Sequence, residues 1–536
     1  IMSKTSKIFN QIPVRVQDKS GFDMSHENLF TAKVGTLIPA SVEEVMPGDV
    51  VSVGSAVSVE LPPLATNFKG RVDARLEAFF VPNRILWGGW QDFIVQDPEH
   101  KPVVPGFSVA TTVPKVRLTT ATAGAGSLAD YLGVKMFTTA AGTPDVNVLP
   151  FLAYQKIIDD WYRDSNIQQP FFIDGLPNIP GASGAQAFNL PYWRDTIVLT
   201  GAAANVNGYN GRDVRSLAQR NFAKDYFTTM TLRPQSGAEA RLQFTVENVG
   251  EDLMPGSFSI ASLRAANSLQ KWLERNNLGG TRYYDQILAH YGTLPSDANI
   301  NRAVLLGSMT TPVIVNSIAQ NAQGTNSQTK NPYANSTGAQ FGRGNAFGKD
   351  SLIDNFKVTE HGYIMIMFSL VPHAYYSTGT RRYLTKRSES STFAFPEFAN
   401  IGDQPVYKSE LVSDEIGAGV DDVEIGYSQR YSEYKYHDDE IHGLLQDGQS
   451  LNSFVLSRGF DDTVTVSSSL LEIPTDFMDS VMVTTSGVSG FNAVVDCYFD
   501  AKYLRVLPEY SLPSLSSGED AVNTHTVNVP KGGTRL

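Results

Sequence analysis

The chain has a single cysteine among its 536 residues, and it lacks long apolar runs. With Cys497 alone no disulfide can form within the chain, which fits a protein made in a reducing compartment. No apolar run follows Lys4 and Lys7, so we expect no signal peptide. The longest apolar run, Tyr363–Pro372, is about half of the ~20 residues that a membrane helix needs. These absences predict a soluble protein, made in the cytoplasm, without a membrane span.

Charged residues are also scarce, and the positive ones are outnumbered. They make up 18% of the chain, below the roughly 25% that is usual for soluble domains. The 43 basic and 55 acidic residues give a net charge of −12, whereas a free nucleic-acid-binding protein is usually basic overall. An acidic chain can still enclose nucleic acid if its positive groups cluster on one face, or if a small basic partner neutralises the charge.

No catalytic constellation can be assigned. The sequence has no Gly-x-Ser-x-Gly motif. Glu360 and His361 precede His373, but their spacing supplies neither a nucleophile nor an orienting group, so we interpret these histidines as core or interface residues. Cys497 lies on the apolar side of an alternating run and is interpreted as a small buried hydrophobe. We therefore predict that the protein is not an enzyme and needs no cofactor.

Two further motifs resemble ligand sites without meeting their requirements. HDDEIH, residues 437–442, has two histidines five positions apart, which suits neither one helix face nor one strand face. We interpret it as an exposed polar strand end rather than a metal site. FGRGNAFGKD, residues 341–350, is one residue short of a phosphate loop and carries Asp350 where Ser or Thr is required. We interpret it as a flexible loop.

Alternation of apolar and polar residues indicates strands. It extends over residues 51–59 and 72–80, and period two places the apolar side chains on one face of a sheet. Both runs end at a proline, Pro62 and Pro82, which removes a hydrogen-bond donor and stops pairing. The last core strand is expected over residues 493–506.

Three segments have a helical pattern. Residues 150–162 begin with a proline at a favoured first position and carry one apolar stripe. A second helix is expected over about 260–276. A third is expected to begin with Thr281 as its N-cap and to end at Gly292.

Strands at both ends of the chain, with helices and loops between them, do not alternate as in a doubly wound fold. We predict one mainly β domain over residues 1–536, an eight-stranded antiparallel jelly roll (a β-sandwich) with long insertions that contain several short helices. The remaining expected parts are an N-terminal arm at 1–20, surface or inter-subunit loops at 96–148, 171–215 and 319–348, and a C-terminal tail at 511–536.

Several blocks of sequence resemble one protein family. The stretch 358–406 joins the strand VTEHGYIMIMFSLVP to the basic turn TRRYLTKR and the return FAFPEFANIGDQPV. Residues 21–82, SLQKWLERNNLGGTRYYDQILAHYG and CYFDAKYLRVLPEYSLPSL follow the same family in the same order. Together they resemble the major capsid protein of microviruses, small tailless bacteriophages with single-stranded DNA, on the gokushovirus-like side of the family.

This resemblance implies a viral jelly roll that assembles in sixty copies into a T=1 icosahedral shell around circular single-stranded DNA. It also implies partners, namely a small basic DNA-binding protein, a minor pilot protein, an internal scaffolding protein and a host surface receptor, and assembly in the bacterial cytoplasm without a membrane. The chain departs from the gokushovirus pattern in one respect. Only residues 236–259 separate DYFTTMTLRPQ from the helix near 260, so we expect no large surface protrusion there.

The basic turn is the candidate DNA contact. Its basic side chains could meet phosphates, and its tyrosine could stack on a base. The residues concerned are Arg381, Arg382, Tyr383, Lys386 and Arg387, with Lys4, Lys7, Lys531 and Arg535 at the chain ends as weaker candidates. The alternative interpretation is a solvated or inter-subunit salt-bridge turn, and the sequence does not decide between the two.

A different class of protein is the alternative for the whole chain. Jelly rolls also occur in carbohydrate-binding and carbohydrate-active proteins, so the fold alone does not exclude them. Trp87, Trp90, Trp161 and Trp193 could stack on sugar rings. Against this hypothesis stand the absence of a signal peptide and of a pair of carboxylates that spacing would place together.

Overall fold

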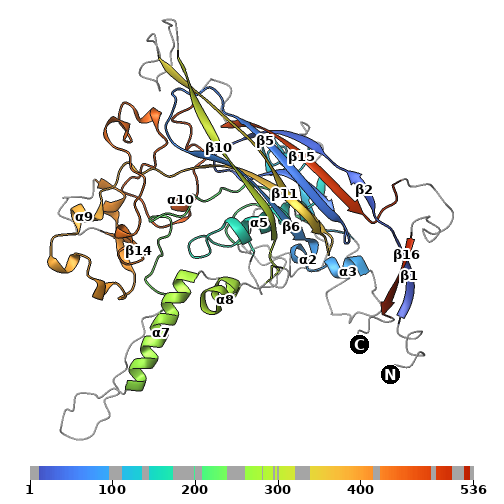
Figure 1. The fold of residues 1–536 in the computed structure, drawn as a ribbon, viewed down its shortest axis with the longest axis horizontal. Coiled ribbons are helices and arrows are strands. Elements are labelled where there is room, and N and C mark those ends of the chain that lie inside the picture. Colours follow the sequence, from blue (N-terminus) through green and yellow to red (C-terminus); the bar gives the residue numbers. More distant parts are fainter. Residues whose placement is uncertain are drawn as a thin grey trace.

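The computed structural model describes residues 11–95, 112–135, 144–172, 198–199, 208–237, 260–279, 282–293, 296–297, 301–319, 339–413, 423–483, 491–509 and 524–530. It is mainly β, with one large curled antiparallel sheet and mostly short helices beside it (Figure 1). Within these ranges no helix is both long and apolar enough to cross a membrane.

The large sheet contains nine strands in the order β2-β15-β5-β11-β10-β6-β12-β4, with β3 also paired to β15. Their bounds are β2 (Ser20–Asp23), β3 (His26–Ala32), β4 (Ile38–Val45), β5 (Val50–Glu60), β6 (Val72–Pro82), β10 (Val304–Ala319), β11 (Gln340–Lys357), β12 (Gly362–Pro372) and β15 (Ala493–Arg505). Because β2 and β3 pair with successive parts of β15, they share one edge position. The sheet therefore has eight positions.

The strand pairs are nested along the sequence. β2 and β3 pair with β15, β4 pairs with β12, β5 with β11, and β6 with β10, all antiparallel. This nested pattern is that of a long hairpin folded over on itself. Further pairing of β15 with β5 and of β6 with β12 joins the strand pairs into one sheet. Two Greek keys in this order make a jelly roll, which confirms the predicted fold class.

Two long strands turn the corner between the halves of the sheet. β10 pairs with β6 over residues 304–313 and then with β11 over 314–319, while β11 goes on to pair with β5 from residue 345. Strands that change sheets form the corners of such sandwiches. The prediction of a flexible loop is therefore wrong for residues 340–350, which belong to β11, and residues 320–338 lie outside the described part.

β12 is buried on both of its faces, and all eleven of its residues are buried. Ile366 and Phe368 point into the sandwich core, which they share with the inner residues of β5 and β15. Met365 and Met367 belong to a second core, in which α2 (Asn83–Leu86) and α5 (Leu149–Ile157) cover the outer face. A strand that is covered on both sides reads as a continuous apolar run, which explains its sequence.

Two insertions carry the remaining elements. Between β6 and β10 lie α2, α3 (Trp90–Val95), β7 (Lys115–Arg117), α4 (Leu128–Tyr131), β8 (Asp145–Asn147), α5, the π-helix η1 (Ile158–Tyr162), β9 (Val198–Leu199), α7 (Ile260–Gly279) and α8 (Tyr283–Tyr291). Between β12 and β15 lie α9 (Arg382–Thr385), β13 (Gln404–Tyr407), β14 (Glu424–Ser428), α10 (Ser468–Leu471) and short 3₁₀ turns. A third apolar cluster joins the two insertions, with Tyr226 and Phe227 from the first against Tyr376 and Leu411 from the second.

The three predicted helices are present with shifted ends. The first begins at Leu149 and ends in the π-helix η1, and the second extends to Gly279. The third begins one residue later than predicted, because Arg282 is its N-cap, and it ends at Gly292 with a φ of 68° as expected of a glycine cap.

The two ends of the described chain pair with each other. β1 (Gln11–Gln17) and β16 (Thr524–Pro530) form a separate two-stranded antiparallel sheet beside the jelly roll (Figure 1). The expected arm at 1–20 and tail at 511–536 thus each contribute a strand. The predicted loops at 96–148 and 171–215 contain β7, β8 and β9, which form a small sheet of their own.

Candidate functional site

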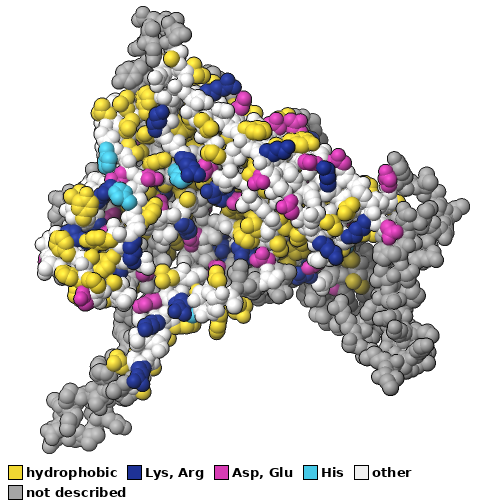
Figure 2. All heavy atoms as spheres, viewed as in Figure 1, with side chains coloured by type: hydrophobic (Ala, Val, Ile, Leu, Met, Phe, Trp, Pro, Cys, Tyr) yellow, Lys and Arg dark blue, Asp and Glu magenta, His cyan; other side chains and the backbone are white. Residues whose placement is uncertain are grey.

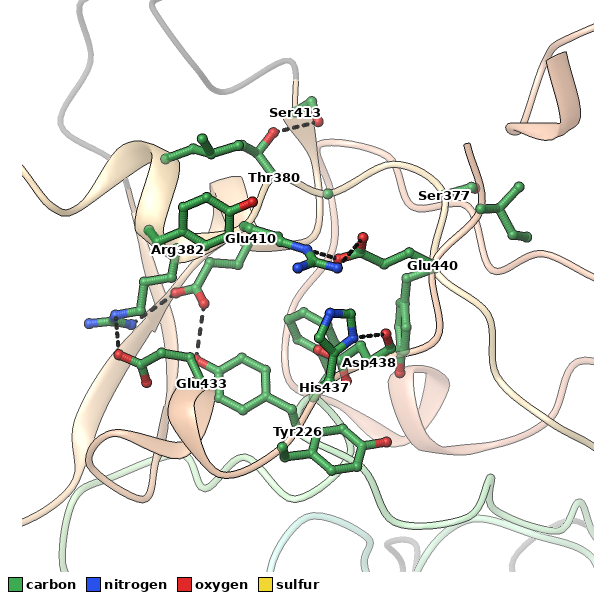
Figure 3. A pocket seen from close by; sticks show the side chains of 18 of the residues that line it. Tyr226, Ser377, Thr380, Arg382, Glu410, Ser413, Glu433, His437, Asp438 and Glu440 are labelled. Atoms are coloured by element: carbon green, nitrogen blue, oxygen red, sulfur yellow. Dashed lines mark hydrogen bonds and ion pairs between the residues drawn. The ribbon is translucent and has the colours of Figure 1, made fainter. Parts of the chain in front are cut away.

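The basic turn lies beside a cavity of about 880 Å³ in the insertion between β12 and β15 (Figure 3). Its lining comes from residues 376–387, from residues 433–446, from Glu410 and Ser413, and from Tyr226 and Phe227. The cavity therefore joins four separate segments of the sequence. It is lined by tyrosines, arginines and carboxylates together.

Arg381 makes a bidentate ion pair across this cavity. Its Nε donates to Glu440 Oε1 at 2.5 Å and its Nη2 donates to Glu440 Oε2 at 2.7 Å. The hydrogen bond from Arg381 lowers the pKa of Glu440, and the same bond raises the pKa of Arg381. This geometry locks both charges in the ionised state. The Arg381 side chain stays 36% exposed, so the pair lies at the surface.

Arg382 points the other way, into the protein. Its Nη1 donates to Glu410 Oε1 at 3.0 Å and to the carbonyl oxygen of Pro405 at 2.7 Å. The hydroxyl of Tyr226 donates to the second oxygen of Glu410 at 3.0 Å. Burial raises the pKa of Glu410, and burial together with the Glu410 charge raises that of Tyr226. Because the Arg382 and Glu410 side chains are only 10% and 4% exposed, this is a buried ion pair.

The last two basic residues of the turn also have partners within the chain. Arg387 pairs with Glu433 and donates to the carbonyl oxygen of Thr392. The ammonium group of Lys386 lies 3.8 Å from the centroid of the Tyr407 ring, a cation–π contact. Tyr383 is 56% exposed, and the guanidinium of Arg381 lies 6.0 Å from the centroid of its ring.

The structure thus brings the turn together with three carboxylates, Glu410, Glu433 and Glu440. The sequence analysis did not single out Glu410 or Glu433, and it considered Glu440 only as part of the HDDEIH motif. Ion pairs within the chain occupy the guanidinium groups of Arg381, Arg382 and Arg387. These ion pairs lie within one subunit, so they are not the inter-subunit salt bridges that the alternative interpretation named, and contact of the turn with DNA stays a prediction. The weaker candidates Lys4, Lys7, Lys531 and Arg535 lie outside the described residues.

One carboxyl group of the cavity has a strongly shifted pKa. Burial, followed by the charges of Asp225 and Glu440, raises the pKa of Asp438 to about 7. Asp225 is itself held by the Tyr376 hydroxyl, which donates to its Oδ2 at 2.5 Å. Asp438 therefore changes its charge near neutral pH.

The other residues considered from the sequence do not form a site together. Glu360 forms an ion pair with Arg84 at 2.8 Å, and His373 lies 3.8 Å from the carboxylate of Asp73. His437 and His442 lie at the cavity, but no group of three potential metal ligands occurs among the residues that the structure describes. Burial raises the pKa of the Cys497 thiol, so it stays protonated.

The described tryptophans are used in packing. Trp87 is fully buried, and Trp161 donates its indole N–H to the Ala303 carbonyl at 2.8 Å while Arg302 covers its ring. Trp90 packs edge-on against His361. Rings in these positions do not form an open platform for a sugar, and Trp193 lies outside the described residues.

Comparison with known proteins decides the class of this chain. The model of the capsid protein (F protein) family matches residues 10–254 and 248–515. The chain belongs to this family of microvirus capsid proteins. It is 26% identical to capsid protein VP1 of Chlamydia phage 1, over 95% of this chain and 97% of that protein. Capsid protein VP1 of Bdellovibrio phage phiMH2K is 25% identical over 94% and 97%, and that of Spiroplasma virus 4 is 23% identical over 94% and 96%.

Family membership and the jelly roll together identify a major capsid protein of a microvirus, with a structural role. The blocks that suggested this family from the sequence now have places in the fold. Residues 21–82 form one half of the rolled hairpin, and 493–505 form its last strand. The stretch 358–406 joins β12 to the basic turn and the cavity wall.

Proposed function

We propose that sixty copies of this chain assemble into a T=1 icosahedral shell around circular single-stranded DNA, in the cytoplasm of a bacterial host. The family match carries this proposal. Many large apolar side chains that one copy leaves exposed support it, because contacts between copies would bury them. The expected loops at 96–148 and 171–215, and residues 320–338 between β10 and β11, would then lie on the shell surface or between subunits.

The charge distribution supports a division of work between partners. The net charge is −12, and the arginines of the basic turn are engaged with carboxylates of the same chain. A small basic protein would therefore neutralise most of the packaged DNA, with Tyr383 available to stack on a base. An internal scaffolding protein, a minor pilot protein and a host receptor complete the expected partners. The protein acts by assembly and has no enzymatic step.

Electron microscopy of the expressed chain, with and without a small basic DNA-binding protein, tests this proposal. We expect closed shells of one size, and circular single-stranded DNA that resists nuclease inside them. A chain that stays monomeric in analytical ultracentrifugation under all these conditions would contradict the proposal.

A further inference from the structure

α7 stands away from the body of the molecule (Figure 1). At ~1.5 Å per residue its twenty residues span about 30 Å. None of its described side chains is buried, and Leu263, Leu269 and Trp272 are 44%, 48% and 52% exposed. Most helices in proteins are stabilised by packing of one face rather than by helix propensity. The C-terminal half of α7 packs against α8, where Trp272 stacks on His290. An isolated subunit therefore leaves chiefly the N-terminal half, with Leu263 and Leu269, exposed.

The charges of α7 follow one side of the helix. Arg264, Lys271 and Arg275 are spaced by seven and four residues, so they form a single stripe, and all three are exposed. Leu263 and Trp272 flank this stripe. Glu274 is the only acidic residue of α7, which makes the helix a basic surface with apolar borders.

A second exposed surface has the opposite character. Residues 388–403, here named the acidic aromatic segment, contain Glu389, Glu397 and Asp403 and no basic residue. All nine residues from 393 to 401 are exposed. Four large apolar side chains stand among them, Phe393 at 50%, Phe395 at 43%, Phe398 at 41% and Ile401 at 61%. Figure 2 shows apolar side chains gathered at this edge of the molecule and basic ones along the projecting helix.

Within one subunit these two surfaces do not use their complementary charges. The end of the acidic aromatic segment approaches α7 at its acidic residue rather than at its basic stripe, because Gly402 lies next to the carboxylate of Glu274. Burial, with the nearby Glu274 charge, raises the pKa of Asp403, as expected where two acidic groups meet. Arg264 and Lys271 of the basic stripe are exposed and have no ion pair with another of the residues that the structure describes.

We propose that α7 of one subunit docks on the acidic aromatic segment of a second copy, with the basic stripe facing Glu389 and Glu397. The apolar borders of the stripe would cover the exposed phenylalanines. The two surfaces differ, so the contact is heterologous and passes from each copy to the next around a symmetry axis until the ring closes. This inference rests on the proposed assembly into shells and names one contact in them.

Cross-linking within assembled particles tests the pairing. Cys497 is buried, so an introduced cysteine is the accessible thiol. The variant that carries both Leu263→Cys and Phe398→Cys, treated with a flexible bismaleimide, should give a ladder of dimers, trimers and higher multiples on a denaturing gel. Each single variant should stay monomeric, and particles that mix the two single variants should give dimers only. As a matched control, Phe347→Cys, at an exposed position of β11, replaces Phe398→Cys and should give no ladder.

The outcomes separate this inference from the proposed function. Normal shells in which the double variant gives no ladder overturn the docking contact alone. Dimers from Leu263→Cys by itself would show that α7 packs against its own copy in the neighbour and would also overturn it. If the unmodified chain forms no shells, the proposed function fails instead.

Charge reversal gives an independent test that needs no thiol. Arg264→Glu with Lys271→Glu should lower the yield of shells about tenfold, because like charges then face each other. Glu389→Lys with Glu397→Lys should do the same. The variant that combines all four changes should recover most of the yield. If it assembles no better than either pair, the proposed pairing is wrong.

Discussion

β12 and residues 393–401 lie within the same recognisable stretch of sequence, and both are rich in large apolar side chains. Their environments are opposite, because every residue of β12 is buried and every residue of 393–401 is exposed. The strand is covered within the subunit by the sandwich core on one face and by the helices α2 and α5 on the other. Apolar composition thus indicates that a segment will be buried in a contact. Only the fold shows whether that contact is made within the same chain.

Truncation of one phenylalanine in each region should give the largest contrast. Phe368 is fully buried in β12, so Phe368→Ala should lower the free energy of unfolding of the subunit by about 3–5 kcal/mol. Phe398→Ala, its matched control at a 41% exposed site, should change that free energy by no more than about 0.5 kcal/mol. Urea unfolding of unassembled subunits measures both. Equal losses would mean that residues 393–401 are packed in the isolated subunit.

The same contrast between buried and exposed positions applies within the basic turn. Arg382→Ala leaves the buried Glu410 carboxylate unpaired, which should cost about 3 kcal/mol of stability. Arg381→Ala removes a pair at the surface, so the loss should stay below about 1 kcal/mol. Thermal unfolding of the two variants side by side checks this order, and a larger loss for Arg381→Ala would contradict it.

A smaller effect is expected from Asp438, whose pKa is raised to about 7. Between its unfolded value near 3.8 and about 7, the folded state binds more protons than the unfolded state. This group therefore favours folding at low pH, and its contribution is lost as the pH rises through that window. Above pH 7, Asp438→Asn should raise stability by about 1–2 kcal/mol, a value reduced from the full shift because the group is partly exposed.

Unfolding curves of this variant at several pH values between 4 and 8 measure the effect. Asp439→Asn, at the exposed neighbouring position, is the control and should leave the pH dependence unchanged. Parallel pH profiles for Asp438→Asn and the unmodified chain would show that Asp438 is solvated in the folded protein.

The smallest effect on stability is expected at Tyr383, which is 56% exposed. Tyr383→Ala should change the free energy of unfolding by less than about 0.5 kcal/mol. If the ring stacks on packaged DNA, the variant shells should hold their DNA less tightly, which a lower temperature of DNA release would reveal. An unchanged release temperature would remove Tyr383 from the candidate DNA contacts.

The sequence predicted four of the strands that pack against the core, β5, β6, β12 and β15, but not β4 or β10. Alternation located β5 and β6, and the continuous apolar run located β12, because burial alone sets these patterns. The sequence pattern was misleading for β11, because its glycines and polar residues are typical of a loop. The structure explains these glycines, since a Cβ at Gly344 would lie 2.3 Å from Leu61 and one at Gly342 would lie 2.4 Å from the Thr66 carbonyl oxygen.

The cavity was less predictable than the sheet. The basic turn was visible as a run of charge, but its partners Glu410, Glu433 and Glu440 come from later parts of the insertion. Nothing in local spacing pairs Arg382 with Glu410, because the insertion between them has no regular period. The acidic residues 437–442 drew attention as ligands, whereas Glu440 instead neutralises Arg381.

The pairing of β1 with β16 places Gln11 beside Pro530 at one corner of the subunit. Positions 11 and 530 could therefore be connected by a short linker, and the chain could be opened at a surface turn elsewhere without loss of any strand of the jelly roll. Such circularly permuted subunits would carry a fused peptide at a chosen point on the particle.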